Sequence, residues 1–192
     1  MENPTGAGGV KPLLEMLAAY NAWANERLYA AAALLPEAQY RADGGAFFGS
    51  LHGTLNHILV GDRIWMHVFT GEGVKPASLD AILCDDLSSL AAARRAEDAR
   101  IVGYIAGLAE ADLAGTVRYR TVRAPADIEQ RLAPLLIHFF NHQTHHRGQA
   151  HSLLTRYGGE APSLDLFIFQ RETGAGIVSG AGGDFGVPER RP

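Results

Sequence analysis

The segment from Leu132 to Tyr157 constrains the fold more than any other part of the chain, because its apolar residues recur at intervals of three and four. This spacing is typical of the face that a helix buries against a core. The apolar stripe consists of Leu132, Leu135, Phe139, Ala150, Leu153 and Tyr157. His142 and His146 fill the gap in the stripe, so we expect both imidazole rings to point into the core.

Two histidines four residues apart on one helical face can reach a single divalent cation. Burying an unpaired polar ring costs roughly a few kcal/mol, so each ring needs a partner. A metal satisfies one ring nitrogen and leaves the other to donate a hydrogen bond. Two buried histidines bonded to carbonyls or water are the alternative, but the pair at 142 and 146 favours the metal. His138 extends the row by one turn, yet a drift of about 40° per step makes it a poorer ligand.

The third ligand is expected from another helix, which carries His52, His57 and His67. His57 is the best candidate, because it lies in the middle of that helix on a face with Gly61, which leaves space for a neighbour or a ligand. His52 and His67 lie near the helix ends, where we expect solvation. Three neutral imidazoles leave a fourth position for water, which is the open arrangement of catalytic sites.

Start and stop signals divide the chain into four main helices. Periodicity predicts helices over residues 12–35, 51–69, 86–108 and 127–157. Ser50 is expected to cap the second of these, and Asp127 with Gln130 resembles a capping box at the start of the fourth. Pro134 is either an early kink in the fourth helix or its true start. The connection after the second helix is long enough to cross over the bundle. Residues 116–123 alternate in polarity and are expected to be extended, for example as a hairpin arm. A short amphipathic helix is predicted within residues 163–172.

Length and composition predict one domain with flexible ends. We expect a helical domain over residues 12–173, a flexible N-terminus over 1–11 and a glycine-rich tail over 174–192. The net charge of −4 is dispersed, which argues against nucleic acid and anionic membranes as partners. No apolar run approaches the roughly 18 residues of a membrane span. The single cysteine, Cys84, fits a reducing compartment, so a cytoplasmic protein is expected.

Three segments carry a resemblance to a known family. These are Tyr20–Leu28, Leu55–Trp65 and His138–Gln149, the last containing the sequence Asn-His-Gln-Thr-His-His-Arg-Gly-Gln. Together they resemble the DinB (damage-inducible, YfiT-like) family over about residues 12 to 172. The resemblance implies an all-α, up-down-down-up four-helix bundle with a crossover connection, commonly a homodimer. It also implies a metal bound by His57, His142 and His146.

The resemblance is less informative about the reaction. Relatives are described as thiol-dependent enzymes, among them bacillithiol transferases and mycothiol-dependent maleylpyruvate isomerases. A divalent metal, with zinc or nickel as the first expectation for all-histidine ligation, would activate a low-molecular-weight thiol for transfer or isomerisation. The alternatives are a hydrolase that activates water and a non-catalytic, metal-stabilised binding or stress-response bundle.

Several polar residues near the predicted ligands are candidates to orient them. They are Asn141, His145, Arg147 and Gln149 beside the histidine pair, and Asp62 on the second predicted helix. Asp62 is expected either to pair with a buried arginine or to bond to a ligand ring. Tyr20, Trp23 and Trp65 are candidates to line a substrate pocket, although their helical spacing favours the bundle core.

Overall fold

The computed structural model describes residues 9–121 and 126–177. The chain divides into two compact units, Met1–Pro162 and Ser163–Pro192. The flexible N-terminus predicted for residues 1–11 and the tail predicted for 174–192 fall largely outside the described residues. Residues 10 and 11 are already helical.

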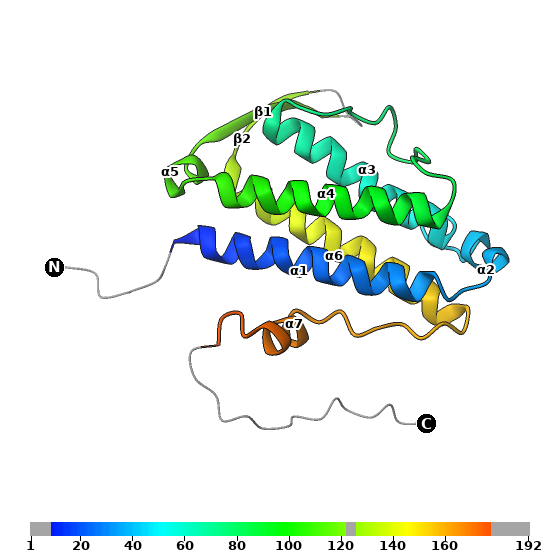
Figure 1. Ribbon diagram of the computed structural model, residues 1–192. Helices are drawn as coiled ribbons and strands as arrows, with labels where there is room; N and C mark the ends of the chain where they lie inside the picture. The colour runs from blue at the N-terminus through cyan, green and yellow to red at the C-terminus, as the bar shows by residue number, and fades with distance from the viewer. Residues whose placement is uncertain (1–8, 122–125, 178–192) are drawn as a thin grey trace. The chain divides into compact units, whose positions relative to one another are not determined.

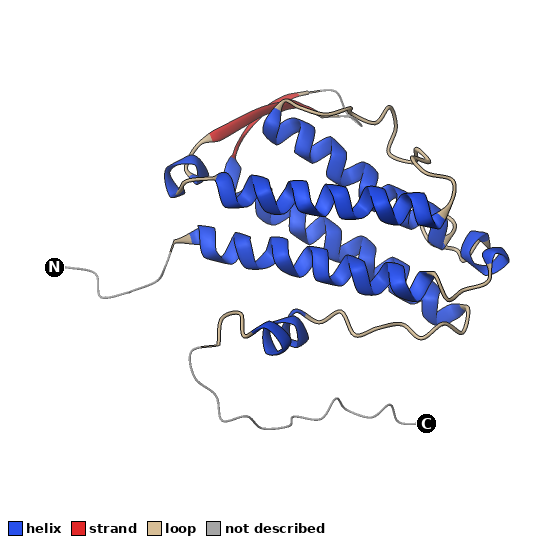
Figure 2. Ribbon diagram, in the orientation of Figure 1, coloured by secondary structure: helices blue, strands red, loops and turns tan. Residues whose placement is uncertain are grey.

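The described residues are mostly helical, with one small β-hairpin (Figure 2). In chain order the elements are α1 (Val10–Ala32), α2 (Glu37–Arg41), α3 (Leu51–Thr70), α4 (Leu87–Gly107), α5 (Glu110–Leu113), β1 (Thr116–Arg120), β2 (Asp127–Arg131), α6 (Leu132–Arg156) and α7 (Leu166–Thr173). The four predicted main helices correspond to α1, α3, α4 and α6. The short helices α2 and α5 were not predicted.

The ends of α3 and α4 follow the local signals in the sequence. The Ser50 hydroxyl accepts a hydrogen bond from the Gly53 amide at 3.0 Å and caps the start of α3. Gly71, with φ of 71°, ends α3 in the left-handed conformation that favours glycine. The Asp86 carboxylate accepts from the Ser89 amide at 2.8 Å and caps the start of α4.

The predicted capping box of Asp127 and Gln130 is wrong, because these residues lie in β2. The strand pairs antiparallel with β1, with Thr116 opposite Arg131 and Arg120 opposite Asp127. Opposite charges meet across the hairpin, and such cross-strand pairs favour extended backbone over a helical start. The fourth main helix therefore begins at Leu132. Pro134 lies in its first turn, where a missing N–H costs little.

The four long helices lie side by side in the unit that ends at Pro162 (Figure 1). Helices α3 and α4 both run opposite to α1, because the connection between them returns along their length, and α6 runs in the direction of α1. The cluster of buried apolar residues between them includes Leu14, Ala18, Met66, Ile101, Ile105, Leu132, Leu136, Phe139 and Phe140. No helix in the described ranges is both long and apolar enough to cross a membrane.

Candidate metal centre

Three histidines from two facing helices form a cluster that we call the three-histidine centre. His57 lies on α3, and His142 and His146 lie one turn apart on α6. Each offers a ring nitrogen, and these nitrogens all lie within 4.8 Å of one another. The structure thus brings together the three residues that the sequence analysis selected as metal ligands.

The ring of His57 is held by contacts on two sides. Its Nδ1 lies 2.7 Å from the backbone carbonyl oxygen of Leu79, on the connection between α3 and α4. A carbonyl oxygen only accepts hydrogen bonds, so Nδ1 carries the proton and Nε2 of the neutral ring presents a lone pair. The ring stacks on Phe48 with 3.6 Å between centroids and is 4% exposed. The orientation of Nε2 is therefore fixed.

His146 is oriented in the same way by a residue on its own helix. Its Nδ1 lies 2.8 Å from Oε1 of Gln149, and this amide oxygen accepts a hydrogen bond from the Nδ1–H group. Its Nε2 lies 3.2 Å from Nε2 of His57. Two nitrogen lone pairs therefore face each other at short range, which is repulsive unless a cation lies between them.

Protonation does not supply that cation near neutral pH. Burial lowers the pKa of His57 to about 4, although the bond to Leu79 acts in the opposite direction. Burial also lowers the pKa of His146. A metal ion fits the geometry, because two nitrogens each about 2.0–2.1 Å from a tetrahedral metal are roughly 3.3 Å apart.

His142 completes the cluster. Its ring centroid lies 4.4 Å from that of His146 and 5.4 Å from that of His57. Its Nδ1 is buried and has no hydrogen-bond partner within the described parts of the chain. Burial, followed by the neighbouring histidines, lowers its pKa to about 3. A buried ring nitrogen without a partner is costly, in either tautomer of the neutral ring, unless a ligand or metal satisfies the ring.

The absence of a side chain at Gly61 makes room for His142. A Cβ atom built at position 61 would lie 2.8 Å from Cε1 of the His142 ring, closer than real contacts allow. The sequence predicts that Gly61 leaves space for a neighbouring helix or a ligand. The structure shows that the neighbour is a predicted metal ligand.

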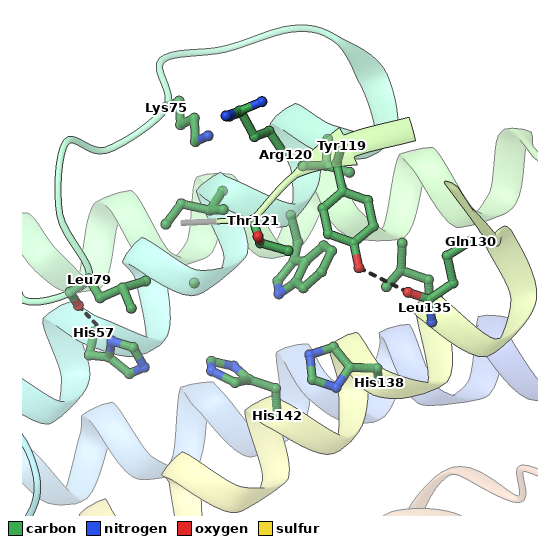
Figure 3. Close-up of a pocket in the computed structure, with 14 residues that line it drawn as sticks. His57, Lys75, Leu79, Tyr119, Arg120, Thr121, Gln130, Leu135, His138 and His142 are labelled. Atoms are coloured by element: carbon green, nitrogen blue, oxygen red, sulfur yellow. Dashed lines mark hydrogen bonds between the residues drawn. The ribbon is translucent and has the colours of Figure 1, made fainter. Parts of the chain in front are cut away.

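A cavity of about 430 Å³ opens beside the centre. Figure 3 shows His57, His142 and His138 on one side of it and Lys75 and Arg120 on the other. Its lining also includes Gly61, Ile64, Trp65, Val68, Leu79, Tyr119, Thr121, Gln130 and Leu135. This volume lies in the range of small-molecule sites. Two of the three imidazoles of the centre, those of His57 and His142, line the cavity, which leaves room for a further ligand beside the centre.

The residues predicted to orient the ligands separate into two groups. Gln149 bonds directly to His146, and the exposed His145 contacts Gln149 through ring and amide nitrogens 3.3 Å apart. Asn141 is exposed, and no contact joins it to the centre within the described residues. Arg147 and Asp62 are buried elsewhere, so the prediction that they orient the ligand rings is not supported by the contacts.

Arg147 and Asp62 belong to a second buried cluster, which we call the ion-pair network. Its members are Asn21 and Asn25 on α1, Asp62 on α3, Arg94 and Asp98 on α4, and Arg147 on α6. Arg94 bonds to Asp62 at 2.5 Å and pairs with Asp98 at 3.0 Å. The buried pairing with an arginine, one of the two alternatives for Asp62, is therefore observed.

The two asparagines connect the carboxylate and guanidinium ends of the network. Their side-chain nitrogens donate to Asp98 at 3.2 Å from Asn21 and 3.0 Å from Asn25. Arg147 donates to the side-chain oxygen of Asn21. Sequence reasoning missed Asn21, Asn25, Arg94 and Asp98. Polar residues at helical spacing within apolar stretches were the available signal, and their partners lie far away in the chain.

The remaining candidates lie at different distances from the centre. His52 is buried, contrary to the expected solvation, because its Nε2 lies 3.2 Å from the Cys84 carbonyl oxygen. His67 is partly exposed and bonds to the Gly73 carbonyl at 3.1 Å. Trp65 lines the cavity. Tyr20 is buried beneath the Arg147 guanidinium instead.

Comparison with known proteins finds similar sequences and a similar fold. Residues 1–178 match the DinB family. A curated relative, Protein DinB of Bacillus subtilis (strain 168), is 25% identical over 164 residues, which cover 80% of this chain and 92% of the relative. A crystal structure of a DinB-like protein from Bacillus cereus ATCC 10987 matches with a TM-score of 0.58 at 15% identity, covering 73% of this chain and 90% of that one. The structural match supports a shared fold.

Proposed function

The chain belongs to the DinB family, and from this premise we propose that it is a divalent-metal enzyme that activates a thiol or a water molecule at an open three-histidine site. One observation carries the proposal. The Nε2 atoms of His57 and His146 face each other at 3.2 Å while both Nδ1 atoms bond to oxygen acceptors. That arrangement calls for a metal, and the adjoining cavity gives a substrate access to it.

The chemistry of the proposed metal is that of a Lewis acid. A divalent ion, zinc or nickel first, would supply a nucleophile at neutral pH by lowering the pKa of a bound thiol or water. His57, His142 and His146 would hold the ion. The Leu79 carbonyl and the Gln149 amide keep two of the rings in the ligating tautomer. Ile64, Val68 and Leu135 give the cavity apolar walls, which limit the water around the reacting groups.

We propose thiol transfer as the first reaction class. The thiol sulfur attacks an electrophilic carbon, a carbon–sulfur bond forms, the leaving group departs with its electron pair, and the thiol proton goes to solvent. Support comes from the family resemblance and from the open side of the three-histidine centre. Hydrolysis of an ester or amide is the second candidate, because the same cavity admits water to the same position.

The proposal includes the surroundings of the protein. We propose an up-down-down-up four-helix bundle as the frame of the site and a homodimer as the assembly, both as the family resemblance implies. We propose a low-molecular-weight thiol as co-substrate, as the family resemblance implies, and a cytoplasmic location, which the single cysteine of the chain fits. Analytical ultracentrifugation of the full chain tests the dimer.

A paired assay tests the enzymatic proposal. Protein loaded with zinc or nickel is given cysteine with 1-chloro-2,4-dinitrobenzene for thiol transfer, and 4-nitrophenyl acetate for hydrolysis. We expect one activity that requires metal, is lost in His57→Ala and is kept in Asn141→Ala, an exposed position on the same helix as the histidine pair. Metal-loaded, folded protein without either activity across a panel of thiols, electrophiles and esters would favour the non-catalytic binding bundle.

A further inference from the structure

The cavity beside the three-histidine centre is chemically asymmetric. One side is formed by the imidazoles of His57 and His142, and the other carries the cationic side chains of Lys75 and Arg120 (Figure 3). The walls between these sides are apolar and aromatic, with Ile64, Trp65, Val68, Leu79 and Leu135 among them. A molecule that fills the cavity therefore meets a metal-ligand set, an apolar passage and a cationic rim.

Lys75 contributes an uncompensated charge to the rim. It lies on the connection between α3 and α4 and is exposed. Within the described residues no carboxylate pairs with its ammonium group. Its position next to Pro76, which has fixed φ, limits the freedom of the connection at this point.

Arg120 contributes a second cation that is partly compensated. Its Nη1 contacts the two carboxylate oxygens of Asp127 at 3.0 and 3.1 Å, across the hairpin from β1 to β2. The pair is exposed, so water screens it and the rim is accessible. The two cations, Lys75 and Arg120, and the one carboxylate, Asp127, together carry one net positive charge at the mouth of the cavity.

The aromatic wall is fixed by its neighbours. Trp65 packs edge-on against Tyr119 and His138, with ring centroids 5.4 and 5.3 Å away. The Tyr119 hydroxyl donates to Oε1 of Gln130 at 2.9 Å, which ties its ring to β2. An apolar or aromatic group that lies against Trp65 therefore meets a surface that is already ordered, which lowers the entropic cost of binding.

We propose that the substrate of this site is an amphiphilic organic anion, with its carboxylate at Lys75 and Arg120 and its aromatic or aliphatic body against Trp65. Its reacting end then points toward His57 and His142. This assignment rests on the proposed function, because it identifies the molecule on which the three-histidine centre acts. In the reverse orientation the carboxylate would bind the metal, and the apolar end would lie among the charges of the rim. That orientation is unfavourable, because it removes the charged groups from water without giving them a partner.

The test measures binding of ω-phenyl carboxylates, from phenylacetate to 5-phenylpentanoate, each beside its uncharged primary amide. Isothermal titration calorimetry at low ionic strength uses the full chain, with zinc and after metal removal. The variants are Lys75→Met and Arg120→Gln. The matched control is Arg118→Gln, which removes a guanidinium from the same strand that pairs across the hairpin with Glu129 and does not line the cavity.

We expect at least one carboxylate to bind about tenfold more tightly than its amide, with a preference that falls as salt is added. Lys75→Met should weaken carboxylate binding roughly three- to tenfold and leave amide binding unchanged. Arg120→Gln should have a smaller effect, because Asp127 already shares that charge, and Arg118→Gln should have none. The Lys75 dependence should persist without metal.

Two results would overturn the inference. One is an equal preference for carboxylates in wild type and Lys75→Met. The other is a preference that disappears with the metal and does not depend on Lys75, which would place the carboxylate on the metal. Metal analysis of the same preparations distinguishes failure of the anion site from failure of the proposed metal site. One equivalent of metal without any carboxylate preference leaves the metal proposal standing, whereas Lys75-dependent binding without metal affinity supports the anion site alone.

Discussion

The three-histidine centre and the ion-pair network are both buried polar clusters built on α3 and α6, yet they differ in how their charges and lone pairs are satisfied. The network contains two carboxylates, Asp62 and Asp98, and two guanidiniums, Arg94 and Arg147, with Asn21 and Asn25 between them. The three-histidine centre contains ring nitrogens that face one another, and no cationic side chain of the described residues lies between them. The formal charges of the network are balanced by the chain itself, although Asp62 Oδ1, Arg94 Nε and Arg147 Nε lack hydrogen-bond partners within the described residues, whereas the facing nitrogens of the centre call for a cation.

This difference separates a structural role from a functional one for residues that are adjacent in the sequence. His146 and Arg147 are neighbours on α6, and Gly61 and Asp62 are neighbours on α3, but each pair is divided between the two clusters. The cavity adjoins only the histidine side. Burial and polarity alone therefore do not mark a functional site, whereas unmet bonding capacity beside a cavity does.

The largest expected effect is on the balanced cluster. Asp62→Ala leaves Arg94 buried with Asp98 as its carboxylate partner, and removing one member of a buried pair costs about 3–5 kcal/mol. Urea unfolding at pH 8 measures the free energy of unfolding. The metal content per folded molecule should stay that of wild type. A loss below about 1 kcal/mol, or a loss of metal from folded protein, would break the distinction between the clusters.

The next effect falls on the open cluster and tests whether Gln149 orients His146. Gln149→Leu removes the acceptor for the Nδ1 proton of His146. Loss of such an orienting bond typically weakens metal binding about 10–100-fold. Competition with a chromophoric chelator measures the metal affinity. Unchanged affinity would mean that the Gln149 contact does not support the centre.

A smaller effect is expected from filling the space at Gly61. Gly61→Ala forces the His142 ring to move, and overpacking of about 1–3 kcal/mol is offset by roughly 1 kcal/mol of helix propensity. We expect a net loss of up to about 2 kcal/mol in urea unfolding together with weaker metal binding. Gly148→Ala is the control. Gly148 lies on the same helix as His142, and a Cβ atom at this position would meet nothing within 4 Å. Equal stabilisation of both variants would contradict the close packing.

The last prediction concerns the pH dependence of the metal-free protein. Burial holds the pKa of His142 at about 3 in the folded state, below the 6.5 of an unfolded histidine. The unfolded state therefore takes up the proton first, so stability is fully present above about pH 6.5 and falls as the pH is lowered toward 3. The slope is about 1.4 kcal/mol per pH unit for one such group.

His142→Ala should reduce the pH slope by this contribution, as measured by urea unfolding between pH 4 and 7, while His57, whose pKa burial lowers to about 4, keeps a slope of the same sign. Burial has the opposite consequence in the network, where it raises the pKa of Asp62 to about 7 despite Arg94. The folded state then holds a proton that the unfolded state has lost, so this contribution to stability falls as the pH rises from about 4 to 7. Identical pH slopes in wild type and His142→Ala would contradict the buried, unprotonated state of His142.

Local patterns in the sequence were sufficient to predict the long helices and the histidine centre. The caps at Ser50 and Asp86 depend on bonds between residues three apart, so they can be read from the sequence. The pairing of His142 with His146 depends on helical spacing alone. His57 required a choice among three histidines, and its position in mid-helix beside Gly61 decided it.

The errors arose where the structure depends on distant partners. Asp127 and Gln130 match a capping box locally, but pairing with β1 extends them into a strand. Arg147 adjoins a ligand in the sequence, yet its partners Asn21 and Asn25 lie more than 100 residues away. The cavity rim brings Lys75 from the α3–α4 connection together with Arg120 from β1, and no periodicity in the sequence indicates that proximity.

The most direct test of the account is the metal content of tag-free protein measured by mass spectrometry. The samples are wild type, His57→Ala, His142→Ala and the control His67→Ala, which removes a partly exposed histidine outside the centre, with folding checked by circular dichroism. We predict about one equivalent of zinc or nickel in wild type and His67→Ala, and little in the two ligand variants although they fold. Folded wild type that binds neither metal, even when both are supplied, would contradict the central claim.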